Sequence, residues 1–146
     1  MAPEPPPSAL VRNPDEPAHC MQIRPIRGRV TVALAGMALG DTRDAVHVLE
    51  FGTDFHDPVV YVPRADVVAP LVPSTAPATW CPLKGWAAYF DLVAHSGATV
   101  VTAAAWAYAE PVAGAEALAD RLAFDSPCLS LEPAAAGAAA SVGAGC

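Results

Sequence analysis

The stretch that decides the fold runs Arg29-Val30-Thr31-Val32-Ala33-Leu34-Ala35-Gly36-Met37-Ala38-Leu39-Gly40-Asp41. In its first half, the apolar residues Val30, Val32 and Leu34 occupy every second position. This period of two is typical of a strand that buries one face. Gly36 then marks a turn, and a second short run follows it. The stretch therefore predicts a β-hairpin.

The same period continues along the chain. Runs rich in Val, Tyr, Phe and Trp cover residues 45–51, 59–62, 85–94 and 98–106, and the loops between them are rich in Gly and Pro. They predict a meander of short strands. One segment differs, because Pro111 to Phe124 carries Val112, Ala115, Leu118 and Leu122 at helical spacing. We expect one short helix there, and hence a mainly β or α+β fold without a Rossmann-type nucleotide domain.

Composition divides the chain into three parts. Residues 1 to 17 are proline-rich and predict a disordered or extended leader. Residues 18–132 suffice for one β-rich domain with its own core. Residues 133–146 are mostly Ala, Gly and Ser, which favours a flexible tail.

Charge and hydropathy narrow the classes of function. A net charge of −7 disfavours a nucleic-acid partner, which would need clustered Lys and Arg. No apolar run is long enough for a membrane span, and the first residues do not resemble a signal peptide, so we expect a cytoplasmic protein. The four cysteines form no Cys-x-x-Cys pair, and no histidine spacing predicts a metal site. Composition does not indicate a cofactor.

The densest run of chemically distinctive residues is Thr79-Trp80-Cys81-Pro82-Leu83-Lys84-Gly85-Trp86. Lys84 is the chain's one lysine. Between two indoles it would lose hydration, which would lower its pKa and suit an amine nucleophile or general base. Alternatively, its stem covers Trp80 or Trp86 while the amine stays in water. Cys81 is either a thiolate nucleophile beside Lys84 or, as we favour, a buried structural cysteine.

Several polar residues are candidates to join Lys84. Glu50 ends the alternating strand 46–50, faces the same side as its buried residues and therefore needs a cation such as Lys84. Arg43 could bind a carboxylate or phosphate with paired hydrogen bonds, with Asp41 beside it, although both also suit a turn. Arg64 and Asp66 could extend the same polar rim.

Aromatic residues are candidates for the walls of the same site. Trp106 and Tyr108 end the last long strand, and Tyr89 lies on the strand that follows Lys84. Together with Trp80 and Trp86 they would form a flat pocket, or else they belong to the core.

With these residues in view, the stretch from His19 to Leu131 resembles domain of unknown function family 427, which also carries a nucleotidyltransferase label. The specific part is the Cys-Pro-x-Lys-Gly run at 81–85 followed by Trp86 and Tyr89. The similarity also includes residues 29–32, 40–43, 49–50, 60–67, 105–108 and 123–124. The resemblance implies a compact, curved, barrel-like or tent-like β domain with a pocket. It implies no established activity, and the chain lacks the Asp-x-Asp pair, Lys-x-Asp-Gly run and phosphate loop of nucleotidyl-transfer chemistry.

Two classes of function follow. The first is a domain that binds a small molecule or nucleotide, with polar groups from Lys84, Glu50 and Arg43 and walls from Trp80, Trp106 and Tyr108. If the domain is an enzyme, Lys84 acts as charge stabiliser or acid/base and Glu50 sets its protonation. The second is a non-catalytic module that presents Trp80 and Trp86 to a protein partner on an exposed patch.

Overall fold

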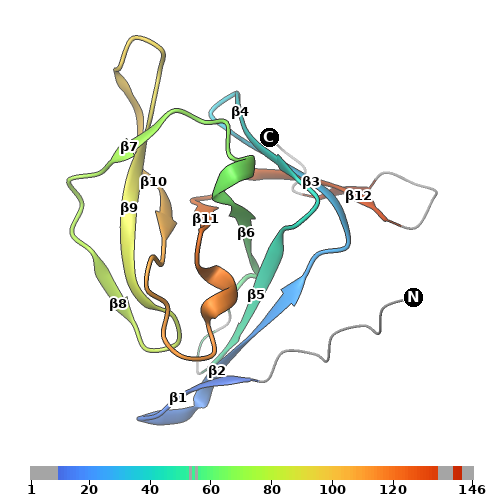
Figure 1. Cartoon of the computed structure of the whole chain (residues 1–146), viewed down its shortest axis with the longest axis vertical. Helices are drawn as coiled ribbons and strands as arrows, with labels where there is room; N and C mark the ends of the chain where they lie inside the picture. The colour runs from blue at the N-terminus through green and yellow to red at the C-terminus, as the bar shows by residue number, and fades with distance from the viewer. Residues whose placement is uncertain (1–9, 53, 55, 135–139, 143–146) are drawn as a thin grey trace.

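Two antiparallel sheets make up the computed structural model, which describes residues 10–52, 54, 56–134 and 140–142 (Figure 1). The strands are β1 (Val11–Asn13), β2 (Glu16–Pro25), β3 (Gly28–Leu34), β4 (Met37–Thr42), β5 (Val46–Phe51), β6 (Val59–Pro63), β7 (Leu71–Pro73), β8 (Thr79–Cys81), β9 (Gly85–Val93), β10 (Thr99–Ala107), β11 (Arg121–Phe124), β12 (Cys128–Pro133) and β13 (Ala140–Val142). Two short 3-10 turns accompany them, η1 (Arg64–Asp66) and η2 (Glu116–Leu118).

The larger sheet curls into a half-barrel. Its strand order is β1-β2-β5-β6-β11-β10-β9-β7, with β8 also paired to β9, and the smaller sheet has the order β13-β12-β3-β4. In Figure 1 the strands from β9 round to β2 curve about an interior that contains η2. This curvature brings β5 and the β8–β9 turn, which are distant in sequence, to the same interior.

Both faces of the half-barrel are buried. Neighbouring residues of its central strands point to opposite faces, and each face packs into its own core cluster. On β6, Tyr61 belongs to a core cluster with Leu118 of η2, whereas Val62 belongs to a second cluster with Val30 and Leu39 of the smaller sheet. The 3-10 turn thus covers the concave face and the smaller sheet covers the convex one. This double burial explains why the central strands are apolar on both sides.

The predicted mainly β class is confirmed, and the strands expected at 29–41, 45–51, 59–62, 85–94 and 98–106 correspond to β3 to β6, β9 and β10. The predicted helix over 111–124 is wrong: within the described residues this segment contains only the turn η2 and the strand β11. Gly114 and Asp120 have positive φ angles of 95° and 58°, which interrupt a helix. Residues 121–124 instead pair with β6 and β10.

The ends of the chain also differ from the expected boundaries. Residues 1–9 of the predicted leader lie outside the described residues, but Val11–Asn13 pairs with β2 as a strand. In the predicted tail, residues 140–142 form β13 beside β12, while 135–139 and 143–146 lie outside the described residues. Composition alone overlooked the pairing because edge strands need few apolar residues.

Candidate functional site

A tight turn between β8 and β9 directs Lys84 into the half-barrel. The Lys84 amide donates to the carbonyl of Cys81 at 3.1 Å, and the Lys84 carbonyl accepts from the Val112 amide at 3.0 Å. Gly85 has a φ of 117°, and a Cβ on it would lie 3.1 Å from the carbonyl oxygen of Glu110. The glycine therefore lets the turn pack closely on the loop after β10, and Lys84 is left only 7% exposed.

The buried ammonium is paired with a carboxylate. Lys84 Nζ donates to Glu50 Oε1 at 2.6 Å, and Glu50 reaches it from β5 on the other side of the interior. Burial alone would lower the pKa of Lys84, but the hydrogen bond and the charge interaction with Glu50 outweigh burial and raise it. The expected lowering of this pKa is therefore wrong. Lys84 is therefore an ammonium ion at neutral pH.

Glu50 also gathers two histidines. His19 Nε2 lies 3.0 Å and His56 Nε2 3.6 Å from Glu50 Oε2. The side-chain nitrogen of Asn13, Nδ2, lies 3.3 Å from His19 Nδ1 and can donate to it. This contact suits the tautomer in which His19 Nε2 carries the proton and donates to Glu50. Burial would raise the pKa of Glu50, but the hydrogen bonds from Lys84 and His19 lower it on balance. The carboxylate is thus held ionised.

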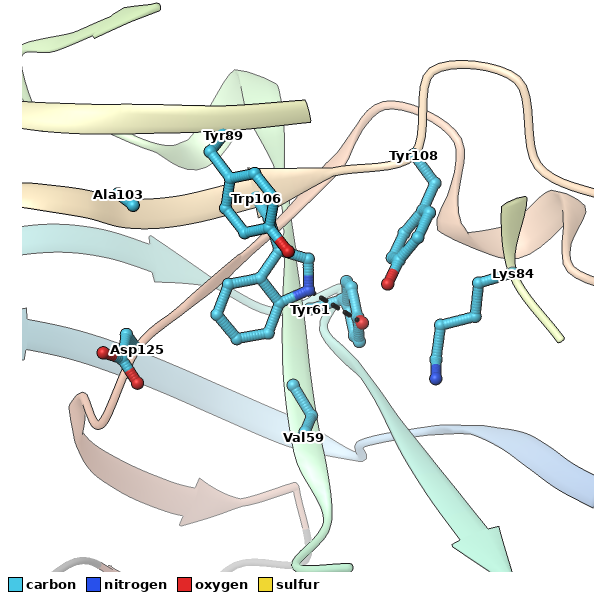
Figure 2. A pocket seen from close by; sticks show the side chains of 8 residues that line it. All are labelled: Val59, Tyr61, Lys84, Tyr89, Ala103, Trp106, Tyr108 and Asp125. Atoms are coloured by element: carbon cyan, nitrogen blue, oxygen red, sulfur yellow. Dashed lines mark hydrogen bonds between the residues drawn. The ribbon is translucent and has the colours of Figure 1, made fainter. Parts of the chain in front are cut away.

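An aromatic cavity of about 390 Å³ lies beside the ion pair (Figure 2). It is lined by Val59, Tyr61, Lys84, Tyr89, Ala103, Trp106, Tyr108 and Asp125. Trp106 Nε1 donates to the Tyr61 hydroxyl at 3.2 Å. Burial raises the pKa values of Tyr61 and Tyr108, so both remain neutral phenols that can donate hydrogen bonds. The cavity thus combines ring faces with hydroxyl groups.

A bulge in β10 forms part of the cavity wall. The register between β10 and β9 shifts between Val101 and Ala105, and Ala103 within this interval has a φ of 50°. Its amide donates to Asp91 Oδ1 at 2.8 Å, and this bond is the main reason that the pKa of Asp91 is lowered. A left-handed alanine costs about 1 kcal/mol. The bulge is therefore a strained feature next to the candidate site.

Part of the predicted site is assembled and part is not. Lys84, Tyr89, Trp106 and Tyr108 line the cavity, and Glu50 holds Lys84 from behind. Cys81 is half-buried with its Sγ 3.8 Å from Lys84 Nζ, although it does not line the cavity. These residues come from β5, β8, β9, β10 and the segment after β10.

The charged candidates on or next to β4 and η1 lie away from the cavity beside Lys84. Asp41, Arg43 and Asp66 belong to a second, more open hollow of about 560 Å³. Asp41 is engaged there by Arg29 through two hydrogen bonds of 2.9 and 2.6 Å, and Asp66 accepts a hydrogen bond from Thr42 at 2.7 Å. The predicted common site is therefore wrong for these residues, because they lie in a different hollow from Lys84.

Three further candidates also lie apart from the cavity lining. The guanidinium of Arg64 stacks over the ring of Phe90 at 5.0 Å. Trp80 and Trp86 pair across β8 and β9 with ring centroids 5.5 Å apart, and they are 53% and 60% exposed. Trp80 is therefore not a wall of the cavity.

Sequence reasoning missed several groups at the site. Tyr61 lies in a run of valines that reads as plain core, and Ala103 and Asp125 carry no motif. His19 lies on β2, the neighbour of β5, and His56 lies in the loop between β5 and β6; both contact Glu50. Only the inward-facing carboxylate of Glu50 signalled that polar partners should gather there.

Among the described residues, no group of three or more His, Cys, Asp or Glu side chains is arranged to hold a metal ion. In the same part of the chain, no helix is long and apolar enough to cross a membrane.

The fold and cavity define a class of protein: a mostly β domain in which a curled sheet encloses a buried Lys–Glu pair beside an aromatic cavity. A family model described as Domain of unknown function (DUF427), with a short label that refers to nucleotidyl transfer, matches residues 22–131. The chain belongs to this family. A search of curated proteins finds no match.

Proposed function

We propose that this chain is a small-molecule-binding domain and that its ligand occupies the cavity next to Lys84. The observation that supports the proposal is the position of the Lys84–Glu50 pair, which lies under the surface at one end of an aromatic cavity. Burying two charges is expensive, and a hydrophobic pair would often stabilise a core better. An ion pair with a buried lysine and a partly buried carboxylate beside a cavity is therefore a candidate binding feature.

The size and charge of the cavity narrow the proposal. Its volume of about 390 Å³ lies at the small end of the range for ligand pockets. Lys84 is the one cationic side chain in the described lining, and Glu50 already balances its charge. Phosphate groups are usually bound by free cationic side chains, backbone amides or metal ions. We therefore propose a compact ligand without a triphosphate, rather than the nucleotide that the family label suggests.

If the domain is also an enzyme, Lys84 has a defined chemical role in this proposal. As an ammonium ion it stabilises negative charge or donates a proton, and Glu50 keeps it charged. The phenols of Tyr61 and Tyr108 are hydrogen-bonded to each other, which leaves one phenolic proton as an additional donor. The arrangement suits a reaction in which an oxygen atom of the ligand gains negative charge.

The test is a fragment screen by ligand-observed NMR on the wild type and on Val59→Phe. Val59 lines the cavity, so a larger side chain there should block part of it. The control is Val68→Phe, the same change at a side chain that is 71% exposed. We expect fragments that bind the wild type and Val68→Phe but not Val59→Phe. Fragments that bind all three proteins equally would show that the cavity is not their site.

A second candidate function rests on the exposed Trp80–Trp86 pair. Large aromatic residues are enriched at the centres of protein interfaces, and these two indoles lie outside the cavity. The proposal is a protein-interaction module, as the sequence analysis allowed. It predicts that Trp80→Ser with Trp86→Ser abolishes partner capture without changing fragment binding. Capture that survives this double change would remove the candidate.

A further inference from the structure

The cavity has two different ends. Figure 2 shows Lys84 at one side and Asp125 at the other, with Trp106 and Tyr61 between them. Asp125 follows β11 directly, and its amide donates to the carbonyl of Ala104 at 2.8 Å. This bond fixes its backbone beside β10. A ligand that spans the cavity therefore meets different chemistry at its two ends.

The charges that face the cavity do not cancel. The positive charge of Lys84 is balanced by Glu50, which lies behind the lining at 2.6 Å. Asp125 has no ion-pair partner among the described residues, and its carboxylate accepts a hydrogen bond from the Ser126 hydroxyl at 3.4 Å. The local balance is therefore one unpaired negative charge. An anionic ligand would meet this charge without a free cation to offset it.

The aromatic walls of the cavity also favour a positively charged ligand. The faces of tyrosine and tryptophan rings attract cations, and aromatic cages with a nearby carboxylate bind organic ammonium groups. Tyr89 and Trp106 both line the cavity. Tyr89 lies on β9 and is directly opposite Trp106 on the neighbouring strand β10. A cationic group near Asp125 would thus be stabilised by ring faces as well as by the carboxylate.

Lys84 supplies a hydrogen-bond donor at the other end. An ammonium group has three protons. Two of them are used by Glu50 Oε1 at 2.6 Å and Cys81 Sγ at 3.8 Å. The third can be donated to an acceptor atom of a ligand. The phenols of Tyr61 and Tyr108 lie nearer to Lys84 than to Asp125 in Figure 2, and because they hydrogen-bond to each other they leave one further phenolic proton for a ligand.

We infer that the ligand is a small organic amine, protonated at neutral pH, with a flat or apolar body and a hydrogen-bond acceptor at its far end. The ammonium group lies near Asp125, the body lies against Trp106, and the acceptor faces Lys84. This inference rests on the proposed function, because it names the ligand class for the same cavity.

The test uses three compounds that share a phenol ring and differ in the charge of the side chain: tyramine is positive, 4-ethylphenol is neutral and 4-hydroxyphenylacetate is negative. Dissociation constants are measured by NMR titration of the wild type at neutral pH. We expect tyramine to bind most tightly and 4-hydroxyphenylacetate most weakly. Val59→Phe should weaken the binding of tyramine, because the larger side chain takes up space in the cavity.

Asp125→Asn removes the carboxylate charge and keeps the shape of the side chain. Because Asp125 is solvent-exposed, the ion pair is partly screened, and we expect tyramine to bind roughly two- to fivefold more weakly. The affinity for 4-ethylphenol should not change. Asp120→Asn is the matched control, since Asp120 is an exposed aspartate outside the cavity lining, and it should leave both affinities as in the wild type.

The outcomes separate this inference from the proposed function. Tighter binding of 4-hydroxyphenylacetate or 4-ethylphenol than of tyramine, or an unchanged tyramine affinity in Asp125→Asn, overturns the amine class and leaves the cavity as a binding site. The amine class also fails if none of the three compounds binds while other fragments occupy the cavity. If no fragment depends on the cavity at all, the proposed function itself fails.

Discussion

Replacing Glu50 with glutamine should destabilise the fold strongly, because it leaves the ammonium of Lys84 buried without a counter-charge. The side chain of Lys84 is 9% exposed and that of Glu50 is 17% exposed. Removing one partner of a buried ion pair typically costs about 3–5 kcal/mol. Solvent reaches part of Glu50, which screens the interaction, so we expect the lower end, about 3 kcal/mol.

The assay is urea unfolding at pH 7, followed by circular dichroism and extrapolated to water. The change should lower the midpoint without a change in slope. Lys84→Met provides the matched comparison, because it removes the ammonium but leaves Glu50 with His19 and His56. We expect this variant to lose only about 1 kcal/mol, since the carboxylate keeps polar partners. The double variant should lose less than the sum of the two single losses by about 2 kcal/mol.

The effect should depend on pH in a defined direction. The pKa of Glu50 is lower in the folded chain than in the unfolded one, so its pairing stabilises the fold above the unfolded value of about 4.3. That contribution disappears as the pH falls through the lower folded value. The pKa of Lys84 is raised, so its contribution is present below about 10.4 and is lost as the pH rises through the higher folded value.

The difference between wild type and Glu50→Gln should therefore shrink as the pH falls from about 5 toward acid. A loss of less than about 0.5 kcal/mol at pH 7 would refute the reasoning, because changes of this size are typical of unimportant surface sites. A loss that stays the same as the pH is lowered past 4 would also refute it, since about two thirds of the unfolded Glu50 carboxyl groups are then protonated.

Gly85→Ala should lower stability by about 2 kcal/mol, because its φ of 117° is strained for alanine and its Cβ would crowd Glu110. Urea unfolding checks this against Gly97→Ala, which has a φ of 87° but no atom within 4 Å, and equal losses would remove crowding as the cause. Ala103→Gly should raise stability by about 0.5 kcal/mol by relieving the left-handed alanine, and a clear loss in the same assay would contradict this strain. Replacing Trp80 and Trp86 with phenylalanine should leave fluorescence that is blue-shifted and less quenched by acrylamide, since both indoles are more than half exposed; unchanged quenching would contradict this exposure.

Parts of the site followed from local sequence alone. Glu50 ends an alternating strand on its buried side, so the need for a cation could be stated without the fold, and the partner is Lys84. The turn residue Gly85 next to that lysine is likewise a local signal, because only glycine adopts its φ of 117° readily.

Other parts could not be predicted because they depend on which strands become neighbours. Arg43 and Lys84 both looked like members of one polar site, yet they lie in separate hollows. The apolar spacing over 111–124 is compatible with a helix, and its residues Ala115 and Leu118 are indeed buried. Residues 121–124 instead form strand β11, whose backbone pairs with β6 on one side and β10 on the other. This tertiary pairing overrides the local helical pattern.

The sequence by itself determined the mainly β class, the strands β3 to β6, β9 and β10, and the family, because side-chain alternation and short motifs are properties of neighbouring residues. Only the tertiary structure decided that Tyr61, Ala103 and Asp125 share a cavity with Lys84 and that Trp80 and Trp86 face outward. The physical reason is the curl of the sheet. It brings β5, β6 and β10 round to the β8–β9 turn, and the sign of the charge in the cavity depends on that arrangement.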